Sequence, residues 1–240
     1  MNTMTEHKKM VYTRPGKTIA LHWFNAVCWL ILTVSGMGII RGDLRFMPNG
    51  FAEWMQNLFG GQLYLIVSHS TLGLIWTGVL VLFTAMSWRE VTWPFLKNVL
   101  SITPRMIIAD AWSMFIDISH LFGLLKNVKL PPAGRYNGAQ RLLGTMILAS
   151  GAMIILTGTV MFTLFIFTGL MVSGAVFQWS LVAHGFFVGL VWIGLVAHIY
   201  YSVIEMPKVL EGMKSGYLDP EFIKHHSPKW YEELKEQGKV

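Results

Sequence analysis

Four long apolar segments, separated by polar ones, dominate the pattern of the chain. They cover residues 19–40, 62–88, 142–167 and 177–203. Each is long enough for an α-helix to cross the hydrocarbon core of a bilayer, which takes about 20 residues. The pattern therefore predicts an all-α integral membrane protein, a bundle of four transmembrane helices that forms a single domain over residues 1–240.

The longest polar connection, residues 89–141, contains two apolar stretches that charged residues interrupt. These stretches cover residues 94–100 and 105–125, and Asp110 and Asp117 fall within the second. Mixed segments of this kind favour one or two helices lying at the membrane interface over a fifth span. A polar tail over residues 205–240 closes the chain.

Composition supports the membrane interpretation and excludes several other classes. The chain is 53% hydrophobic and only 13% charged, which is too apolar for a soluble domain of 240 residues. Its formal charge of +6 is spread between the spans, so we expect no nucleic-acid partner. Because Cys28 is the one cysteine, an intrachain disulfide, a covalently attached haem and a self-supplied iron–sulfur cluster are excluded.

The distribution of Lys and Arg predicts the orientation. Seventeen of these residues lie in the N-terminal segment, the connection 89–141 and the tail, whereas Arg41 and Arg45 are the two in residues 41–61 and residues 168–174 have none. Basic residues concentrate on the cytoplasmic side of membrane proteins. We therefore expect a multi-pass protein of the bacterial cytoplasmic (inner) membrane with both termini and the long connection in the cytoplasm.

Four histidines lie inside the apolar segments: His22, His69, His184 and His198. An ionisable side chain within a membrane span is costly and is a functional hypothesis by default. His184 and His198 are fourteen residues apart, so they share one helix face at two depths, about 21 Å apart. This spacing suggests two stacked b-type haems, each bound by one imidazole from this helix and one from another.

The expected orientation pairs the histidines by depth. His69 and His184 would ligate an outer haem, and His22 and His198 an inner haem near the cytoplasmic face. Two imidazoles saturate the iron, which suits electron transfer better than catalysis at the metal. Gly36, fourteen residues after His22, would leave room for a porphyrin edge at the depth of the outer haem. The alternative for any single histidine is a polar side chain bonded to a neighbouring carbonyl.

Two motifs add a family resemblance. The sequence GRYNGAQ at residues 134–140 and the sequence KHHSPKWYE at residues 224–232, together with the four histidines, resemble the cytochrome b (gamma) subunit of respiratory formate dehydrogenases. The resemblance extends from Arg14 to Glu233. The chain departs from the family pattern in its longer, more apolar connection and in Asn-Gly-Ala-Gln where the family has Asn-Ala-Gly-Gln.

The resemblance implies a role in electron transfer. The chain would take electrons from an iron–sulfur (beta) subunit with its own membrane anchor helix, fed by a molybdenum- or tungsten-containing catalytic (alpha) subunit. It would deliver them through two haem b groups to menaquinone or another quinone near the cytoplasmic face. The resemblance implies no formate-oxidising or other catalytic residue in this chain, and residues 41–61 are the region expected to contact the beta subunit.

The same resemblance implies a quinone site. Asn137 matches a quinone-site residue of the family, and His198, Gln140 and Tyr136 are candidates from proximity. Asn is also a favoured residue at helix N-caps, so a structural role for Asn137 is the alternative.

Two other function classes stay open. The bundle could serve a nickel–iron hydrogenase or a thiosulfate reductase, which use similar four-helix di-haem subunits. It could instead be a non-haem transporter or scaffold whose histidines relay protons or bind a metal, although the spans lack Asp, Glu, Lys and Arg at their centres. The direction of electron flow, the quinone and the oligomeric state of the complex are also left open.

Overall fold

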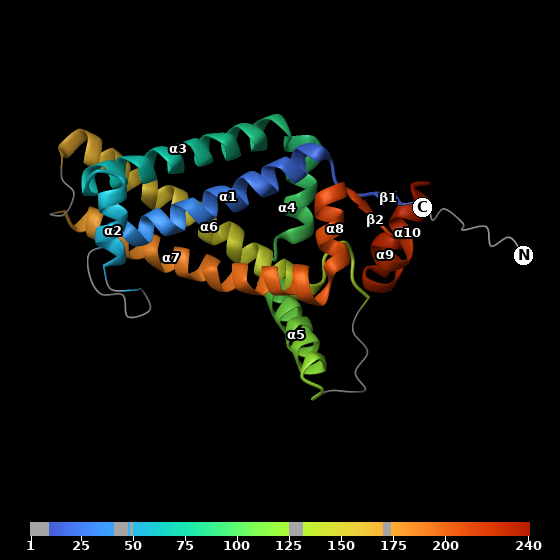
Figure 1. Cartoon of the computed structure of the whole chain (residues 1–240). Coiled ribbons are helices and arrows are strands. Elements are labelled where there is room, and N and C mark those ends of the chain that lie inside the picture. Colours follow the sequence, from blue (N-terminus) through green and yellow to red (C-terminus); the bar gives the residue numbers. More distant parts are fainter. Residues whose placement is uncertain (1–9, 41–47, 49, 125–131, 170–173) are drawn as a thin grey trace, which may run out of the picture. The chain divides into compact units, whose positions relative to one another are not determined.

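The computed structural model of the chain is almost entirely helical (Figure 1). It describes residues 10–40, 48, 50–124, 132–169 and 174–240. The elements are, in chain order, β1 (Val11–Tyr12), α1 (Gly16–Ile39), α2 (Phe51–Leu58), α3 (Gln62–Met86), the π-helix η1 (Trp88–Thr92), α4 (Trp93–Val99), α5 (Pro104–Leu121), α6 (Gly138–Thr168), α7 (Ala175–Tyr200), the π-helix η2 (Tyr201–Glu205), α8 (Pro207–Ser215), β2 (Tyr217–Leu218), α9 (Pro220–His226) and α10 (Pro228–Glu236).

Four helices are long and apolar enough to span a membrane, as the sequence predicts. They are α1, α3, α6 and the continuous segment Ala175–Glu205, which joins α7 to η2. The chain is therefore an all-helical, multi-pass membrane protein. The predicted bounds differ most at α6, which begins at Gly138 and not at residue 142. The apolar span begins only at residue 142, after polar residues, but the helix itself begins about one turn earlier.

The connection 89–141 contains the helices that its apolar stretches predict. Both α4 and α5 carry a proline in their first turn, where its missing N–H costs nothing. The hydroxyl of Thr103 caps α5 by accepting the backbone N–H of Met106 at 3.2 Å. The end of the second predicted stretch, residue 125, and residues 126–131 lie outside the described residues.

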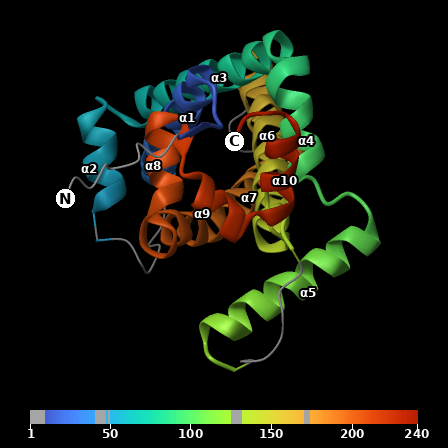
Figure 2. The same cartoon turned by 90° about the vertical axis from the view of Figure 1, so that its right-hand side faces the viewer.

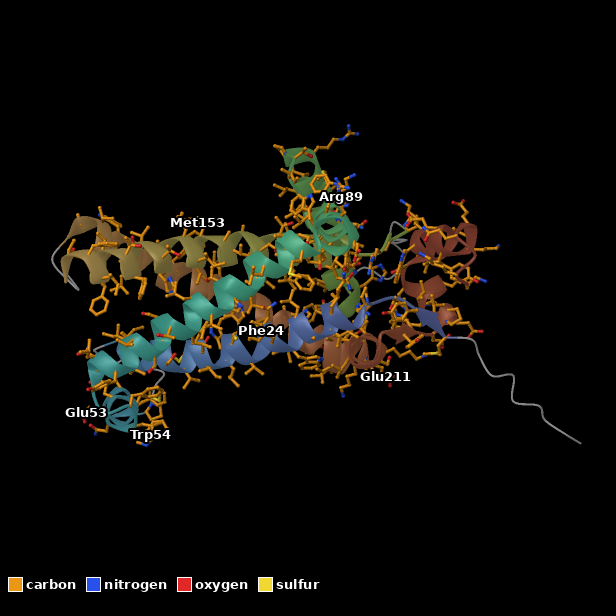
Figure 3. The ribbon with its side chains drawn as sticks, turned by 90° about the horizontal axis from the view of Figure 1, so that it is seen from above. Phe24, Glu53, Trp54, Arg89, Met153 and Glu211 are labelled. Atoms are coloured by element: carbon orange, nitrogen blue, oxygen red, sulfur yellow. The ribbon has the colours of Figure 1, made fainter. Side chains whose placement is uncertain are left out.

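Backbone contacts divide the chain into two compact units. The first unit comprises residues 1–19, 89–148 and 192–240, and the second comprises residues 20–88 and 149–191. In the second unit, α2 packs beside the start of α3, and Figure 3 shows Glu53 and Trp54 on α2 near the end of α1. A Cβ atom on Gly38 would lie only 2.7 Å from Cβ of Met55, so this close packing requires a glycine.

The first unit contains a small core that joins both ends of the chain. Strands β1 and β2 pair in antiparallel register, Val11 with Leu218, and helices α9 and α10 pack against each other (Figure 2). Val11, Leu218, Ile223 and Leu234 form its buried centre. The tail that the sequence predicts only as polar is therefore three helices and a strand.

The two sequence motifs contact each other in the first unit. The guanidinium of Arg135 lies 5.2 Å from the centre of the Trp230 ring and donates to the backbone carbonyl of Thr13 at 3.2 Å. The backbone N–H of Lys229 donates to the carbonyl of Ala133 at 3.2 Å. The motif before α6 is thereby fastened to both terminal segments, which gives these residues a structural role.

The first turns of α6 are held against α5 by an ion pair. Arg141 Nε lies 3.3 Å from Asp110 Oδ2, which also accepts a short hydrogen bond from Ser101. A Cβ atom on Gly138 would lie 2.7 Å from Cβ of Ser113, so a glycine is required where the two helices meet. A Cβ atom on Gly144 would lie 2.6 Å from Val99 Cγ1, as expected for a glycine at a close approach.

The buried carboxyl of Asp117 on α5 is expected to make the stability of the protein depend on pH. Its Oδ2 atom is buried without a hydrogen-bond partner among the described residues, and burial raises the pKa of the Asp117 carboxyl, while the nearby His120 acts in the opposite direction. An acid whose pKa is raised on folding contributes stability at pH values below its unfolded pKa of about 3.9, and this stability is lost as the pH rises through the folded value.

We expect Asp117→Asn to make the thermal stability of the detergent-solubilised protein higher than that of the wild type at pH 7, with the difference disappearing toward pH 4. Glu211→Gln, which removes an exposed carboxylate, is the control. It should leave the thermal stability unchanged both at pH 7 and toward pH 4. An Asp117→Asn variant less stable than wild type at pH 7 would show that the carboxylate has a partner that stabilises its charged form.

Candidate functional site

The second unit places His69 of α3 against Ser35 of α1. Ser35 Oγ lies 2.9 Å from His69 Nδ1 and also 2.7 Å from the backbone carbonyl of Ile31, one turn earlier on its own helix. A hydroxyl has one hydrogen, which it donates to this carbonyl. The Ser35 oxygen therefore accepts, and His69 Nδ1 carries the proton.

The same arrangement recurs at His184 of α7. Thr157 Oγ1 on α6 lies 3.0 Å from His184 Nδ1 and donates to the carbonyl of Met153 at 2.7 Å. Thr157 is itself buried. By the argument used for Ser35, this hydroxyl accepts the Nδ1 proton of His184.

Protonation at Nδ1 fixes the tautomer of both rings. Nε2 then carries the lone pair, and a neutral imidazole with a free Nε2 is a metal ligand. Hydrogen bonding through the other ring nitrogen is the usual way in which a protein orients such a ligand. His69 and His184 are thus prepared to bind a metal through Nε2.

A glycine next to each hydroxyl lets the imidazole approach. A Cβ atom on Gly36 would lie 3.3 Å from His69 Cε1, and one on Gly158 would lie 3.3 Å from His184 Cε1. The sequence predicts that Gly36 lies at the depth of His69, and it does. Its neighbour in the structure is the imidazole ring itself, and Gly158 has the same role at His184.

His69 and His184 both lie in the second unit. Among the described residues, no group of three or more His, Cys, Asp or Glu side chains is arranged to hold a metal ion. A bare ion is therefore a poor fit, because structural and catalytic metal sites use three or four protein ligands. Iron in a porphyrin takes four ligands from the ring, so two imidazoles complete its coordination.

His22 and His198 belong to different units. His22 on α1 lies edge-on to Trp23, with ring centres 5.3 Å apart, and His198 lies in the last turn of α7. Their pairing as ligands of an inner haem stays a prediction.

Asn137 and Gln140 form a capping box at the start of α6. Asn137 Oδ1 accepts the backbone N–H of Gln140 at 2.8 Å, and Gln140 Oε1 accepts the backbone N–H of Asn137 at 3.1 Å. The capping role raised by the sequence is therefore present. Both amide oxygens are used, so the NH₂ groups are the remaining hydrogen-bonding groups of these side chains. The ring of Tyr136 packs edge-on to Phe95, with ring centres 6.4 Å apart.

Sequence reasoning missed Ser35 and Thr157. Each is a hydroxyl residue followed directly by glycine within an apolar span, Ser35-Gly36 and Thr157-Gly158. A polar hydrogen-bonding group beside a missing side chain is the signal that could have identified them, since both features bring helices into close contact.

Comparisons with known proteins identify the family of the chain. Residues 13–216 match the sequence profile of the family described as prokaryotic cytochrome b561. Over 226 residues the chain is 18% identical to the formate dehydrogenase cytochrome b556(fdo) subunit of Escherichia coli K12, covering 93% of this chain and 92% of the relative. The subunits from strains O6:H1 and O157:H7 match equally well.

Proposed function

Because the chain belongs to the prokaryotic cytochrome b561 family, we propose that it is the di-haem cytochrome b subunit of a respiratory formate dehydrogenase. Membership of a cytochrome b family implies haem b and disfavours the non-haem transporter or scaffold. The relatives named formate dehydrogenase subunits, which align over nearly the whole chain, support the choice of enzyme.

The observation that carries the proposal is the hydrogen bond that His69 and His184 each make with a hydroxyl group. Each ring is held through Nδ1 by a hydroxyl from another helix, and each presents Nε2 as the ligand atom. Haem b, when bound, supplies a one-electron carrier. The residues of the chain provide axial ligation, hold the ring orientation and exclude water with their apolar surroundings.

The second haem in this proposal is bound by His22 and His198. The fourteen-residue spacing on α7 supports it, since His198 shares a helix face with His184 at a second depth. With the basic residues concentrated in the connection 89–141 and the terminal segments, this second pair lies near the cytoplasmic face, and both termini are cytoplasmic. Electrons enter at the outer pair from an iron–sulfur subunit, which a molybdenum- or tungsten-containing subunit supplies.

Quinone, preferably menaquinone, is the proposed acceptor near the start of α6. Its reduction takes two electrons and two protons and needs hydrogen-bond donors at the carbonyl oxygens. The capping box leaves the NH₂ groups of Asn137 and Gln140 as such donors, and Tyr136 and His198 are the other proposed contacts. Asn137 thereby has two roles, with its oxygen in the helix cap and its nitrogen toward the quinone.

The haem content of the protein tests the assignment of the four histidines. We expect two haem b per chain in a pyridine haemochrome assay, with His184→Ala and His198→Ala each removing a different haem from the reduced-minus-oxidised spectrum. His120→Ala is the control, because His120 lies outside the four spans and should leave both haems in place. A wild-type chain without a Soret band, or variants that both retain two haems, would refute the proposal.

A substitution at Thr157 tests the role of the hydroxyl that orients His184. Thr157→Val keeps the shape of the side chain and removes the acceptor of the Nδ1 proton, which lowers the basicity of the ligand. We expect the midpoint potential of one haem to rise and its affinity to fall about tenfold. Thr159→Val, at an exposed position of the same helix, should change neither quantity. Equal behaviour of the two variants would remove Thr157 from the site.

Two substitutions at Asn137 separate its two proposed roles. Asn137→Ser keeps an N-cap acceptor and loses the amide donor, so stability and both haems should persist while reoxidation of the pre-reduced haems by a menaquinone analogue slows. Asn137→Ala also loses the cap and should cost about 1 kcal/mol of stability. If Asn137→Ser is reoxidised at the wild-type rate, Asn137 is a helix cap alone.

A further inference from the structure

Arg14 is fixed in place just before the first turn of α1. Its backbone N–H donates to the carbonyl of Gly216 at 3.2 Å. A Cβ atom on Gly212 would lie 2.9 Å from Arg14 Nη1, and one on Gly216 would lie 2.8 Å from its carbonyl oxygen. The guanidinium therefore lies directly over Gly212 of α8 within the first unit, and Gly216 makes room for the backbone of Arg14.

The charge of Arg14 is not balanced by the residues around it. Nη1 is buried and makes no hydrogen bond with any described residue. Burial lowers the pKa of Arg14, the positive charge of Arg135 lowers it further, and Tyr136 acts in the opposite direction. Burial of an unpaired charge is costly, and an anion bound beside the Arg14 guanidinium would offset this cost. The neighbours that act on Arg14 supply no carboxylate.

Thr18 provides a second buried donor nearby in the sequence. Its Oγ1 atom is also buried without a hydrogen-bond partner among the described residues. Thr18 lies in the first turn of α1, one turn, or about 6 Å along the axis, before His22. A hydroxyl and a guanidinium nitrogen together match the two oxygens of a carboxylate, which accepts charge-assisted hydrogen bonds from both.

We propose that Arg14 and Thr18 bind a propionate carboxylate of the haem for which His22, one turn after Thr18 on α1, is a proposed ligand. The inference rests on the proposed function, because it requires that haem. Haem b carries two propionates at one edge of the porphyrin. A propionate bound here would neutralise the Arg14 charge, use both unpaired donors and fix which edge of the ring faces the cytoplasmic end of α1.

The surroundings of Arg14 call for a ligand that carries a negative charge. A quinone is neutral and leaves the buried charge unpaired. A lipid phosphate carries the same kind of charge as a propionate, so the experiment must separate these two sources.

The experiment is a redox titration of the full-length chain with its haems, comparing Arg14→Gln with the wild type. Loss of a positive charge beside a propionate disfavours addition of an electron, so the midpoint potential of one haem should fall while the other stays unchanged. Arg14→Lys should restore most of the potential, and Thr18→Val should lower the potential of the same haem by a smaller amount. Arg105→Gln removes an equal charge from an exposed position and should alter neither haem.

A second arm identifies the anion. Apoprotein is reconstituted with haem b or with its dimethyl ester, which has no propionate charge. Arg14→Gln should weaken the affinity of the apoprotein for haem b and should not weaken its affinity for the ester, which has no carboxylate for Arg14 to bind. Equal weakening with both ligands would assign the anion to lipid, and unchanged potentials in both Arg14→Gln and Thr18→Val would overturn the inference. A wild-type chain that binds no haem would instead refute the proposed function, which the pyridine haemochrome assay reports independently.

Discussion

The hydrogen bond from each imidazole Nδ1 to a helix hydroxyl is the interaction on which the candidate site depends. In a membrane span an unpaired imidazole N–H would be costly, and an imidazole free to rotate could present either nitrogen. Ser35 and Thr157 solve both problems, because each hydroxyl is itself directed by its bond to a backbone carbonyl one turn earlier. The orientation of the ring is thereby set by the helix backbone and not by flexible side chains.

A glycine follows each of these two hydroxyl residues in the sequence. Helix association in a membrane gains little from the hydrophobic effect, so it relies on close packing and on polar contacts between helices. At Gly36 and Gly158 the absence of a side chain brings the ring to within van der Waals contact of the facing helix. The adjacent hydroxyl then makes the polar contact. One dipeptide therefore supplies both kinds of interaction at each imidazole.

The long elements could be predicted from the sequence because length and apolarity alone define a span. The four histidines stood out for the same reason, as ionisable groups in apolar surroundings. The tail could not be predicted in detail, since its helices are short, begin at prolines and depend on contacts with β1 far away in the sequence. Ser35 and Thr157 escaped notice because an isolated hydroxyl in a span usually bonds its own helix, and both do so here as well as contacting an imidazole.

Charged side chains lie mainly outside the centres of the four spans and are concentrated in the first unit. Arg135 is satisfied there by the Trp230 ring and by the carbonyl of Thr13. Arg141 is paired with Asp110, so each of these arginines serves to fasten a segment to its neighbours. Arg14 differs from both, because its buried Nη1 makes no hydrogen bond with a described residue and none of the neighbours that act on its charge is a carboxylate, although its backbone is already held by Gly216. Since the fold does not need this charge for fastening, a ligand that brings a negative charge is the physical reason to bury it.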